Sequence, residues 1–232
     1  MTRTLVIGDV HGCSDELALM VSGTRPDRIV LVGDLYTKGP DPVGVHKQIR
    51  EHAMEVVLGN HDQRLIDVMK GKRKDDSHGQ AVVEALKEAD ASWVQWISDQ
   101  PLFREVDGWT VVHAALHPSG KLDRTSRKTA LSLRRWPDDA SSDARWWEVY
   151  KGKRRVVFGH DARQGLLLAR PDSQGRPKVV GLDTGCVYGG ELTGMWLDDG
   201  TIVQVRAARA YKPVRGFKKG AAGRFATSDE PA

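Results

Sequence analysis

Side chains that bind metal ions follow apolar runs at five places in this sequence. The five segments read LVIGDVH, LVGD, VVLGNH, TVVH and VVFGH, and they carry Asp9 and His11, Asp34, Asn60, His113 and His160. One such ending has an ordinary structural explanation, because Gly-Asp favours a turn after any strand. Repetition at five strand ends instead predicts that the six side chains gather at one metal centre.

The six residues supply two carboxylates, one amide oxygen and three imidazoles. We expect manganese first, with cobalt, iron, zinc or magnesium as alternatives, because calcium prefers oxygen ligands alone. Asp34 is the natural bridge between two ions, since an ionised carboxylate can bind both. Two ions roughly 3.5 to 4 Å apart lower the pKa of a shared water and hold an attacked phosphorus centre. The residue types therefore predict a two-metal hydrolytic site.

The spacing of these residues indicates strands joined by helical crossovers. Asp34 comes 25 residues after Asp9, and Asn60 comes 26 residues after Asp34, about one crossover unit each time. In such a sheet the ligand residues lie in loops beyond the carboxyl ends of the strands. Apolar residues at helical spacing predict helices within 13–24, 41–52 and 64–70.

The second half of the chain contains further strands and one large insertion. The pattern predicts a helix over 80–98, hairpins that turn at 107–108 and 199–200, and a polar, tryptophan-bearing insertion over about 117–152. We therefore expect a single domain over 1–210, with the insertion over its active-site end. A basic and solvated tail is expected over 211–232.

Composition limits the setting in which the chain acts. The 232 residues carry a formal net charge of +4, and the apolar runs are far shorter than the roughly 20 residues of a membrane span. No signal-peptide pattern precedes the first strand, so we expect a cytoplasmic protein without a membrane partner. Cys13 and Cys186 match no disulfide framework or zinc spacing and are expected as plain thiols. Nucleic acid is expected at most to touch the tail weakly, and the oligomeric state is left open.

The order of the motifs resembles a known family. GDVHG, GDLYTKGPD, GNHD, VHA, FGHDA and LDTGCVYGG, spread over the chain to about residue 205, resemble the calcineurin-like metallophosphoesterases. Within them the sequence is most similar to the symmetrical diadenosine tetraphosphatase (ApaH) and ApaH-like phosphatase branch. The resemblance implies an α/β (α+β) fold, a two-layer β-sandwich flanked by helices, with the metals at loops between its sheets.

The resemblance also implies roles for individual residues. Asp9, His11 and Asp34 match one metal site of the family, and Asp34 is shared with the second. That second site is matched by Asp34, Asn60, His113 and His160. His61 matches the general acid that protonates the leaving oxygen.

Three further residues are candidates for substrate binding. Lys38 stands where the protein phosphatases of this superfamily carry a phosphate-binding arginine, and lysine lacks the bidentate fork of arginine. Thr37 stands where those phosphatases place an acid beside the catalytic histidine. Both departures favour a substrate other than a phosphoprotein. Arg134 resembles a basic residue in the insertion of the ApaH-like family and is assigned to phosphate, with a solvated surface position as the alternative. Tyr188 matches a family loop near the metals, where it would contact substrate or pack in the core.

Other aromatic and imidazole side chains carry weaker expectations. A nucleobase could stack on Trp136, Trp146, Trp147 or Tyr36, although tryptophans in an insertion more commonly pack it down. His46, His52, His78 and His117 match no motif and are expected at the surface.

The leading hypothesis is an enzyme that hydrolyses diadenosine tetraphosphate into two ADP. A water activated by the two metal ions attacks an inner phosphorus, and His61 protonates the departing ADP. The alternatives within the superfamily are a protein serine/threonine phosphatase and a broad phosphomonoesterase or polyphosphatase. A metal-dependent binding module without turnover is the alternative from another class.

Overall fold

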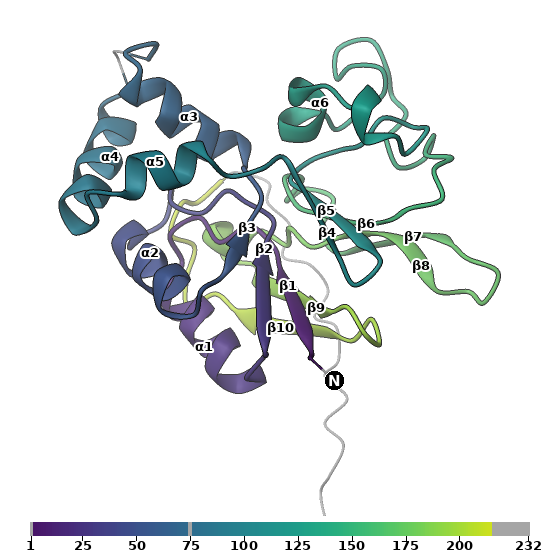
Figure 1. Ribbon diagram of the computed structural model, residues 1–232, viewed down its shortest axis with the longest axis horizontal. Helices are drawn as coiled ribbons and strands as arrows, with labels where there is room; N and C mark the ends of the chain where they lie inside the picture. The colour runs from purple at the N-terminus through teal and green to yellow at the C-terminus, as the bar shows by residue number, and fades with distance from the viewer. Residues whose placement is uncertain (1, 74–75, 215–232) are drawn as a thin grey trace, which may run out of the picture.

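Two mixed β-sheets of five strands each face one another in the computed structural model, which describes residues 2–73 and 76–214 (Figure 1). The first sheet has the order β10-β9-β1-β2-β3 and the second has the order β4-β5-β6-β8-β7. β1, β2 and β3 are parallel, as are β5, β6 and β8, while the remaining strands pair antiparallel. The strands are β1 (Thr4–Ile7), β2 (Arg28–Leu31), β3 (Glu55–Val56), β4 (Phe103–Val106), β5 (Trp109–Val112), β6 (Arg155–Phe158), β7 (Leu167–Pro171), β8 (Pro177–Gly181), β9 (Glu191–Trp196) and β10 (Ile202–Arg206).

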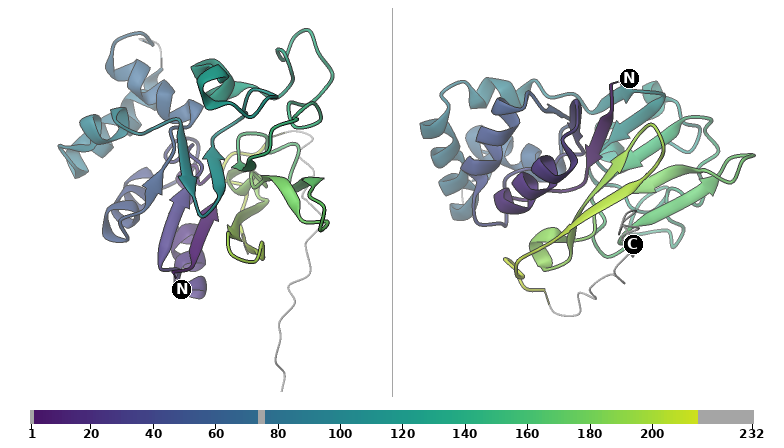
Figure 2. Two further views of the ribbon diagram at one scale, coloured as in Figure 1. Left: turned by 45° about the vertical axis from the view of Figure 1, so that its right-hand side comes forward. Right: turned by 90° about the horizontal axis from the view of Figure 1, so that it is seen from below.

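Five helices cover the outer face of the first sheet, and the insertion covers the outer face of the second (Figures 1 and 2). The predicted two-layer sandwich flanked by helices is therefore confirmed. The helices are α1 (Ser14–Thr24), α2 (Pro42–Glu51), α3 (Asn60–Met69), α4 (Ser77–Ala89), α5 (Trp93–Ser98) and α6 (Arg127–Ser132), with short 3-10 turns η1 (Leu122–Arg124) and η2 (Cys186–Tyr188).

Two helical predictions differ from the structure. The helix predicted over 80–98 is two helices, because the Asp90 carboxylate accepts hydrogen bonds from the backbone and hydroxyl of Ser92 and forms a local turn. The helix predicted from residue 64 begins at Asn60 instead. Consequently Asn60 and His61 lie in the first turn of α3, where the backbone fixes their directions.

Successive side chains of a strand point to opposite faces of its sheet, and this places the apolar residues in three layers. One lies beneath the helices, one between the sheets and one beneath the insertion. On β1, Leu5 and Ile7 pack toward the helices, whereas Val6 packs between the two sheets. On β6, Val157 faces the other sheet, whereas Phe158 faces the insertion. Strands such as β1 and β6, which are buried on both faces, are almost continuously apolar in sequence. The inner strands are therefore held from both sides, and their ends are fixed in space.

The insertion is held down by aromatic packing. Trp146 is buried against Phe158 of β6, with ring centroids 5.1 Å apart, and against Tyr150, with ring centroids 5.7 Å apart. Trp136 and Trp147 pack partly against the same cluster. Tyr36 is fully buried among the helices. Packing, the more common use of such residues, is confirmed for Trp146 and Tyr36, which are not accessible to a base.

The surface position predicted for His46 is wrong. Its side chain is 2% exposed, and Tyr36 donates its hydroxyl proton to Nδ1 at 3.1 Å. Nε2 donates to Asp90 at 2.9 Å. His46 therefore links α2 to the loop between α4 and α5, a tertiary contact that sequence periodicity does not reveal. His52 and His78 are exposed as expected.

The C-terminal segment continues to contact the body beyond residue 210. The backbone N–H of Ala208 and the hydroxyl of Tyr211 donate to Glu16 of α1 at 3.0 and 2.8 Å. The Lys212 N–H donates to the Val187 carbonyl at 2.9 Å. Most of the predicted basic tail, residues 215–232, lies outside the described residues.

Across the described ranges, no helix combines the length and the apolar character that crossing a bilayer would require.

We predict that His46→Ala lowers the free energy of unfolding by about 1 to 3 kcal/mol, because the buried Tyr36 hydroxyl loses its acceptor. Urea unfolding monitored by circular dichroism measures the change. His78→Ala, at an exposed position of α4, is the matched control and should change stability by no more than about 0.5 kcal/mol. Equal losses in the two variants would contradict the structural role of His46.

Candidate metal centre and active site

The six predicted ligands lie at one edge of the sandwich, beyond the ends of β1, β2, β3, β5 and β6. Five lie in loops, and Asn60 begins α3. Three of them adopt a left-handed backbone, with φ of 48° at His11, 54° at Asp34 and 70° at His160. Residues other than glycine avoid this region, and such strain concentrates at functional sites. The fold therefore holds these side chains in directions that a relaxed loop would not adopt.

Asp34 lies between two histidines. One carboxylate oxygen is 3.4 Å from Nε2 of His11, and the other is 3.4 Å from Nε2 of His113. Burial acts to raise the pKa of Asp34, but His113, His61, His11 and Lys38 together hold that pKa below its ordinary value. Asp34 is therefore ionised, with one oxygen directed to each half of the cluster.

Hydrogen bonds on the far side of the rings fix the tautomers of His113 and His160. Nδ1 of His113 donates to the Val32 carbonyl at 2.9 Å, and Nε2 of His160 donates to the Ser132 carbonyl at 3.0 Å. Burial lowers the pKa of both histidines, so the rings are neutral. Each ring thus presents a lone pair to the cluster.

The two lone pairs converge on a third acceptor. Nε2 of His113 lies 2.8 Å and Nδ1 of His160 lies 2.9 Å from the amide oxygen Oδ1 of Asn60. Three acceptors without a proton among them repel one another, whereas a cation placed beside all three would be attracted to each. This donor set fits a divalent metal ion.

Buried acids give the other half of the cluster an excess of negative charge. Asp9 accepts the His160 N–H at 3.1 Å, and one oxygen lies 4.0 Å from Nε2 of His11. Burial, together with the charges of Asp183 and Asp34, raises the pKa of Asp9 well above its ordinary value. Burial also raises the pKa of Asp183 to about 7. A cation would relieve the repulsion among these carboxylates.

His61 lies at the cavity wall beside this cluster. Its backbone N–H donates to Asp34 at 2.8 Å, and Nδ1 is 2.9 Å from the hydroxyl of Thr37. Burial lowers the pKa of His61 to about 4. Because a hydroxyl both accepts and donates, Thr37 can bond the neutral and the protonated ring.

Lys38 lies between the ligands and Tyr188. Its ammonium donates to Nε2 of His11 at 2.8 Å and lies 5.4 Å from the centroid of the Tyr188 ring. The lone pair of this His11 nitrogen therefore points into the cavity. Lys38 also has a left-handed backbone, with φ of 77°.

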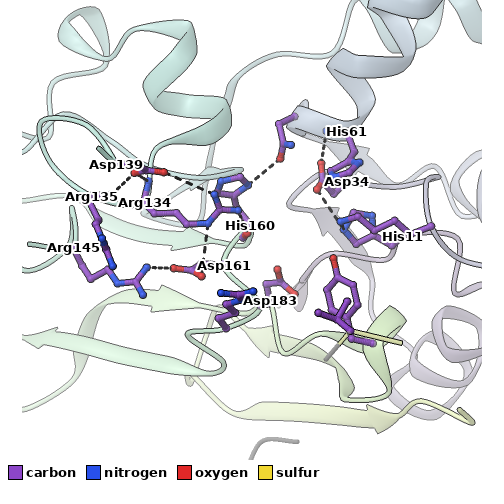
Figure 3. A pocket seen from close by; sticks show the side chains of 16 residues that line it. His11, Asp34, His61, Arg134, Arg135, Asp139, Arg145, His160, Asp161 and Asp183 are labelled. Carbon is purple, nitrogen blue, oxygen red and sulfur yellow. Dashed lines mark hydrogen bonds and ion pairs between the residues drawn. The ribbon is translucent and has the colours of Figure 1, made fainter. Parts of the chain in front are cut away.

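The cavity has a volume of about 470 Å³ and two chemically different walls (Figure 3). One wall carries His11, Asp34 and His61. The other wall, beyond His160, carries Arg134, Arg135 and Arg145 together with Asp139 and Asp161. Arg163 also lines the cavity. The predicted substrate residues Lys38, Arg134 and Tyr188 all line this cavity.

Acidic side chains hold two of the arginines in place. Asp161 pairs with Arg145 Nη1 and lies 3.7 Å from Nε of Arg134. Arg134 also donates to the His160 carbonyl at 3.2 Å, so this wall is joined to the ligand loop. Arg135 and Arg145 lie opposite one another in an antiparallel bridge of the insertion.

Several residues of the site were not predicted from sequence. Asp62 accepts three backbone N–H groups, from Asp34 at 2.8 Å and from Leu35 and Gly59 at 3.0 Å, and thereby holds the loops after β2 and β3 together. Burial raises the pKa of Asp62 to about 7. Asp183 also follows an apolar run, the same sequence signal that the six predicted ligands carry. Arg145 and Asp161 had no distinguishing sequence signal beyond the position of Asp161 next to His160.

Comparisons with known proteins agree with this geometry. Residues 2–202 match the family model described as calcineurin-like phosphoesterase. A symmetrical bis(5'-nucleosyl)-tetraphosphatase of Janthinobacterium sp. (strain Marseille) is 27% identical, over 90% of this chain and 98% of the relative. The crystal structure of a candidate diadenosine tetraphosphatase has a TM-score of 0.73 and 30% identity, over 89% of this chain and 94% of that chain.

A protein serine/threonine phosphatase of Saccharomyces cerevisiae shares the fold at a TM-score of 0.53 and 14% identity, over 89% of this chain and 79% of that chain. This likeness concerns the fold alone. Members of the matched family use divalent metal ions, which the buried donor set described above fits. The chain belongs to the calcineurin-like phosphoesterase family and is a phosphoesterase.

Proposed function

We propose that this enzyme cleaves dinucleoside tetraphosphates symmetrically, with diadenosine tetraphosphate yielding two ADP. The observation that carries the proposal is the number of cations in the cavity, which is lined by four arginines, three of them on the wall opposite His11, Asp34 and His61. A single phosphate needs no such extent of positive charge, whereas a chain of four phosphates spans both walls. The names of the relatives, symmetrical bis(5'-nucleosyl)-tetraphosphatases, support the same substrate class.

We further propose two metal positions that share Asp34. Asp9 and His11 would complete one, and Asn60, His113 and His160 would complete the other. Divalent ions held there, manganese first, supply a water of lowered pKa and neutralise charge on phosphorus oxygens. Free cysteines and the family chemistry are compatible with action in the cytoplasm, where we place the enzyme.

His61 is proposed as the acid that protonates the leaving nucleotide. At neutral pH the buried ring is neutral, since its pKa is about 4, so it needs a proton before it can act. The negative charge of a bound polyphosphate favours the protonated ring and raises that pKa. Thr37 keeps the ring oriented through Nδ1 in both forms, and Nε2 is left for the substrate.

The second candidate is hydrolysis of phosphomonoesters, because the metal-ligand set can act on any accessible phosphorus centre. Thr37 and Lys38 disfavour a phosphoprotein substrate, and the arginines of the cavity favour a longer polyphosphate. Chromatography after incubation with diadenosine tetraphosphate tests the proposal, because an enzyme restricted to phosphomonoesters would leave this substrate intact. Release of ADP as the sole nucleotide product from diadenosine tetraphosphate supports the proposal, whereas AMP with ATP would contradict symmetrical cleavage.

We predict that Asp34→Asn abolishes turnover and lowers the metal content of the protein, because one neutral amide replaces the carboxylate shared by both positions. Metal analysis after gel filtration and phosphate release from a chromogenic monoester measure the two effects. Asp143→Asn, in the exposed part of the insertion, is the control and should retain both. Full metal content in Asp34→Asn would refute the bridging role.

For His61→Ala we expect unchanged metal content and a loss of kcat of about 10²- to 10⁴-fold, the typical contribution of a positioned acid. A substrate with a very acidic leaving group should lose less, since it needs no proton to depart. If His61→Ala lost metal together with activity, the residue would be a ligand and the assignment of the acid would be wrong.

Lys38 and Arg134 should affect different substrates. Lys38 lies beside the ligands, so Lys38→Ala should impair monoesters and diadenosine tetraphosphate alike, by roughly tenfold to a hundredfold in kcat/KM. Arg134→Ala should impair the dinucleotide far more than the monoester, because the arginine contacts phosphates distant from the attacked one. Equal losses on both substrates for Arg134→Ala would remove the basis for polyphosphate recognition by the insertion.

A further inference from the structure

We propose that Cys13, Glu16 and Cys186 form a separate structural metal site for a zinc-class ion. One ligand atom from each residue lies within 4.8 Å of the other two, and all three residues are buried. Cys13 immediately precedes α1 and Glu16 lies in its first turn, three residues later, so both face the same side. Cys186 begins η2, a distant part of the chain. Neither cysteine is in a disulfide.

Glu16 supplies the independent evidence for a ligand. Its oxygen Oε1 accepts hydrogen bonds from Ala208 and Tyr211, but Oε2 is buried and has no hydrogen-bond partner. No ion pair among the described residues includes Glu16. A buried carboxylate oxygen without a partner is costly and calls for an unseen partner such as an ion. A dication next to two thiols would be that partner.

The donor types determine which ion fits. Two sulfurs and one carboxylate oxygen suit Zn²⁺ or Co²⁺, whereas Mn²⁺ and Mg²⁺ favour oxygen and nitrogen donors. Binding releases the two thiol protons to solvent and leaves two thiolates, one carboxylate and one dication, a net charge of −1. The N-terminal end of α1, where Cys13 and Glu16 lie, favours negative charge. Three protein ligands leave one tetrahedral position for water.

The position of this site explains what it would do. Cys13 is two residues from His11, and Cys186 is three residues from Asp183. Glu16 in addition holds the C-terminal segment through Ala208 and Tyr211. An ion bound to all three ligands would join the loop after β1, the η2 turn and the C-terminal segment. It would thereby fix two loops of the catalytic cavity without touching substrate.

Cobalt distinguishes this site from the catalytic centre. Thiolate ligands give Co²⁺ an intense charge-transfer band in the near ultraviolet, and no predicted ligand of the catalytic centre contains sulfur. The full chain is produced in cobalt-supplemented medium, so that the buried site is filled during folding. We expect this band in the wild type, and we expect no such band in protein produced in zinc-supplemented medium.

Variants separate the two centres. The double variant Cys13→Ser/Cys186→Ser should lose the band, while Asp34→Asn, which weakens the catalytic positions, should keep it. Removing a group that only hydrogen-bonds to a metal ligand typically weakens metal binding by roughly 10- to 100-fold. Because Glu16 is proposed as a ligand itself, Glu16→Gln should weaken cobalt binding by more than this. Ala208 and Tyr211 can still donate to the amide oxygen of this variant.

Absence of the band from the cobalt-loaded wild type would overturn the proposal and would mean that Cys13 and Cys186 are plain buried thiols. This test does not depend on whether the variants fold. Persistence of the band in the double variant would overturn it as well. The measurement needs no substrate, so its failure is independent of the proposed tetraphosphatase activity.

Discussion

An ionised carboxylate, Asp34, is only 2% exposed at the middle of the candidate metal-ligand cluster, and the surrounding structure must compensate that charge. Its backbone N–H is held by Asp62, its side chain accepts the His61 N–H, and histidines lie at both oxygens. So little of this carboxylate is exposed that protein groups and cations must replace most of its hydration. The nearby buried acids Asp9 and Asp183 increase this requirement, because their charges repel that of Asp34.

The two sheets contribute to the centre in different ways. Loops of the first sheet carry Asp9, His11 and Asp34, while loops of the second carry His113 and His160. The insertion then adds cations without adding a ligand. Because Trp146 and Tyr150 pack on the outer face of the second sheet, the arginines of the same segment can extend toward the cavity. The candidate metal ligands and the cavity arginines Arg134, Arg135 and Arg145 thus come from separate parts of the chain.

The sequence predicted the fold and the candidate site best where an apolar run was followed directly by a residue able to bind metal. Strand ends, crossovers and the six candidate ligands could be predicted, since apolar runs and their polar endings are local features. Asp62 and His46 could not be predicted, because their importance comes from backbone or hydroxyl groups that fold against them from distant segments. The break at Asp90 was missed for a similar reason: a side chain that competes with helical hydrogen bonds is only a weak signal. The place of Arg145 in the site could not be predicted either, because it depends on how the insertion folds to bring Arg145 beside Asp161.

The inner layer between the sheets, built from valines such as Val6, Val111 and Val157, ends at the same edge where ligands from both sheets meet. Cations bound to ligands from both sheets would hold the two sheets together at that edge. If one sheet slid over the other, the ligands would move apart. Metal affinity and the docking of the sheets are therefore thermodynamically linked, and the linkage is reciprocal. Removing a methyl group from a valine of the inner layer would lower the metal affinity of the distant ligand cluster. Bound ions would in turn make the inner layer more rigid.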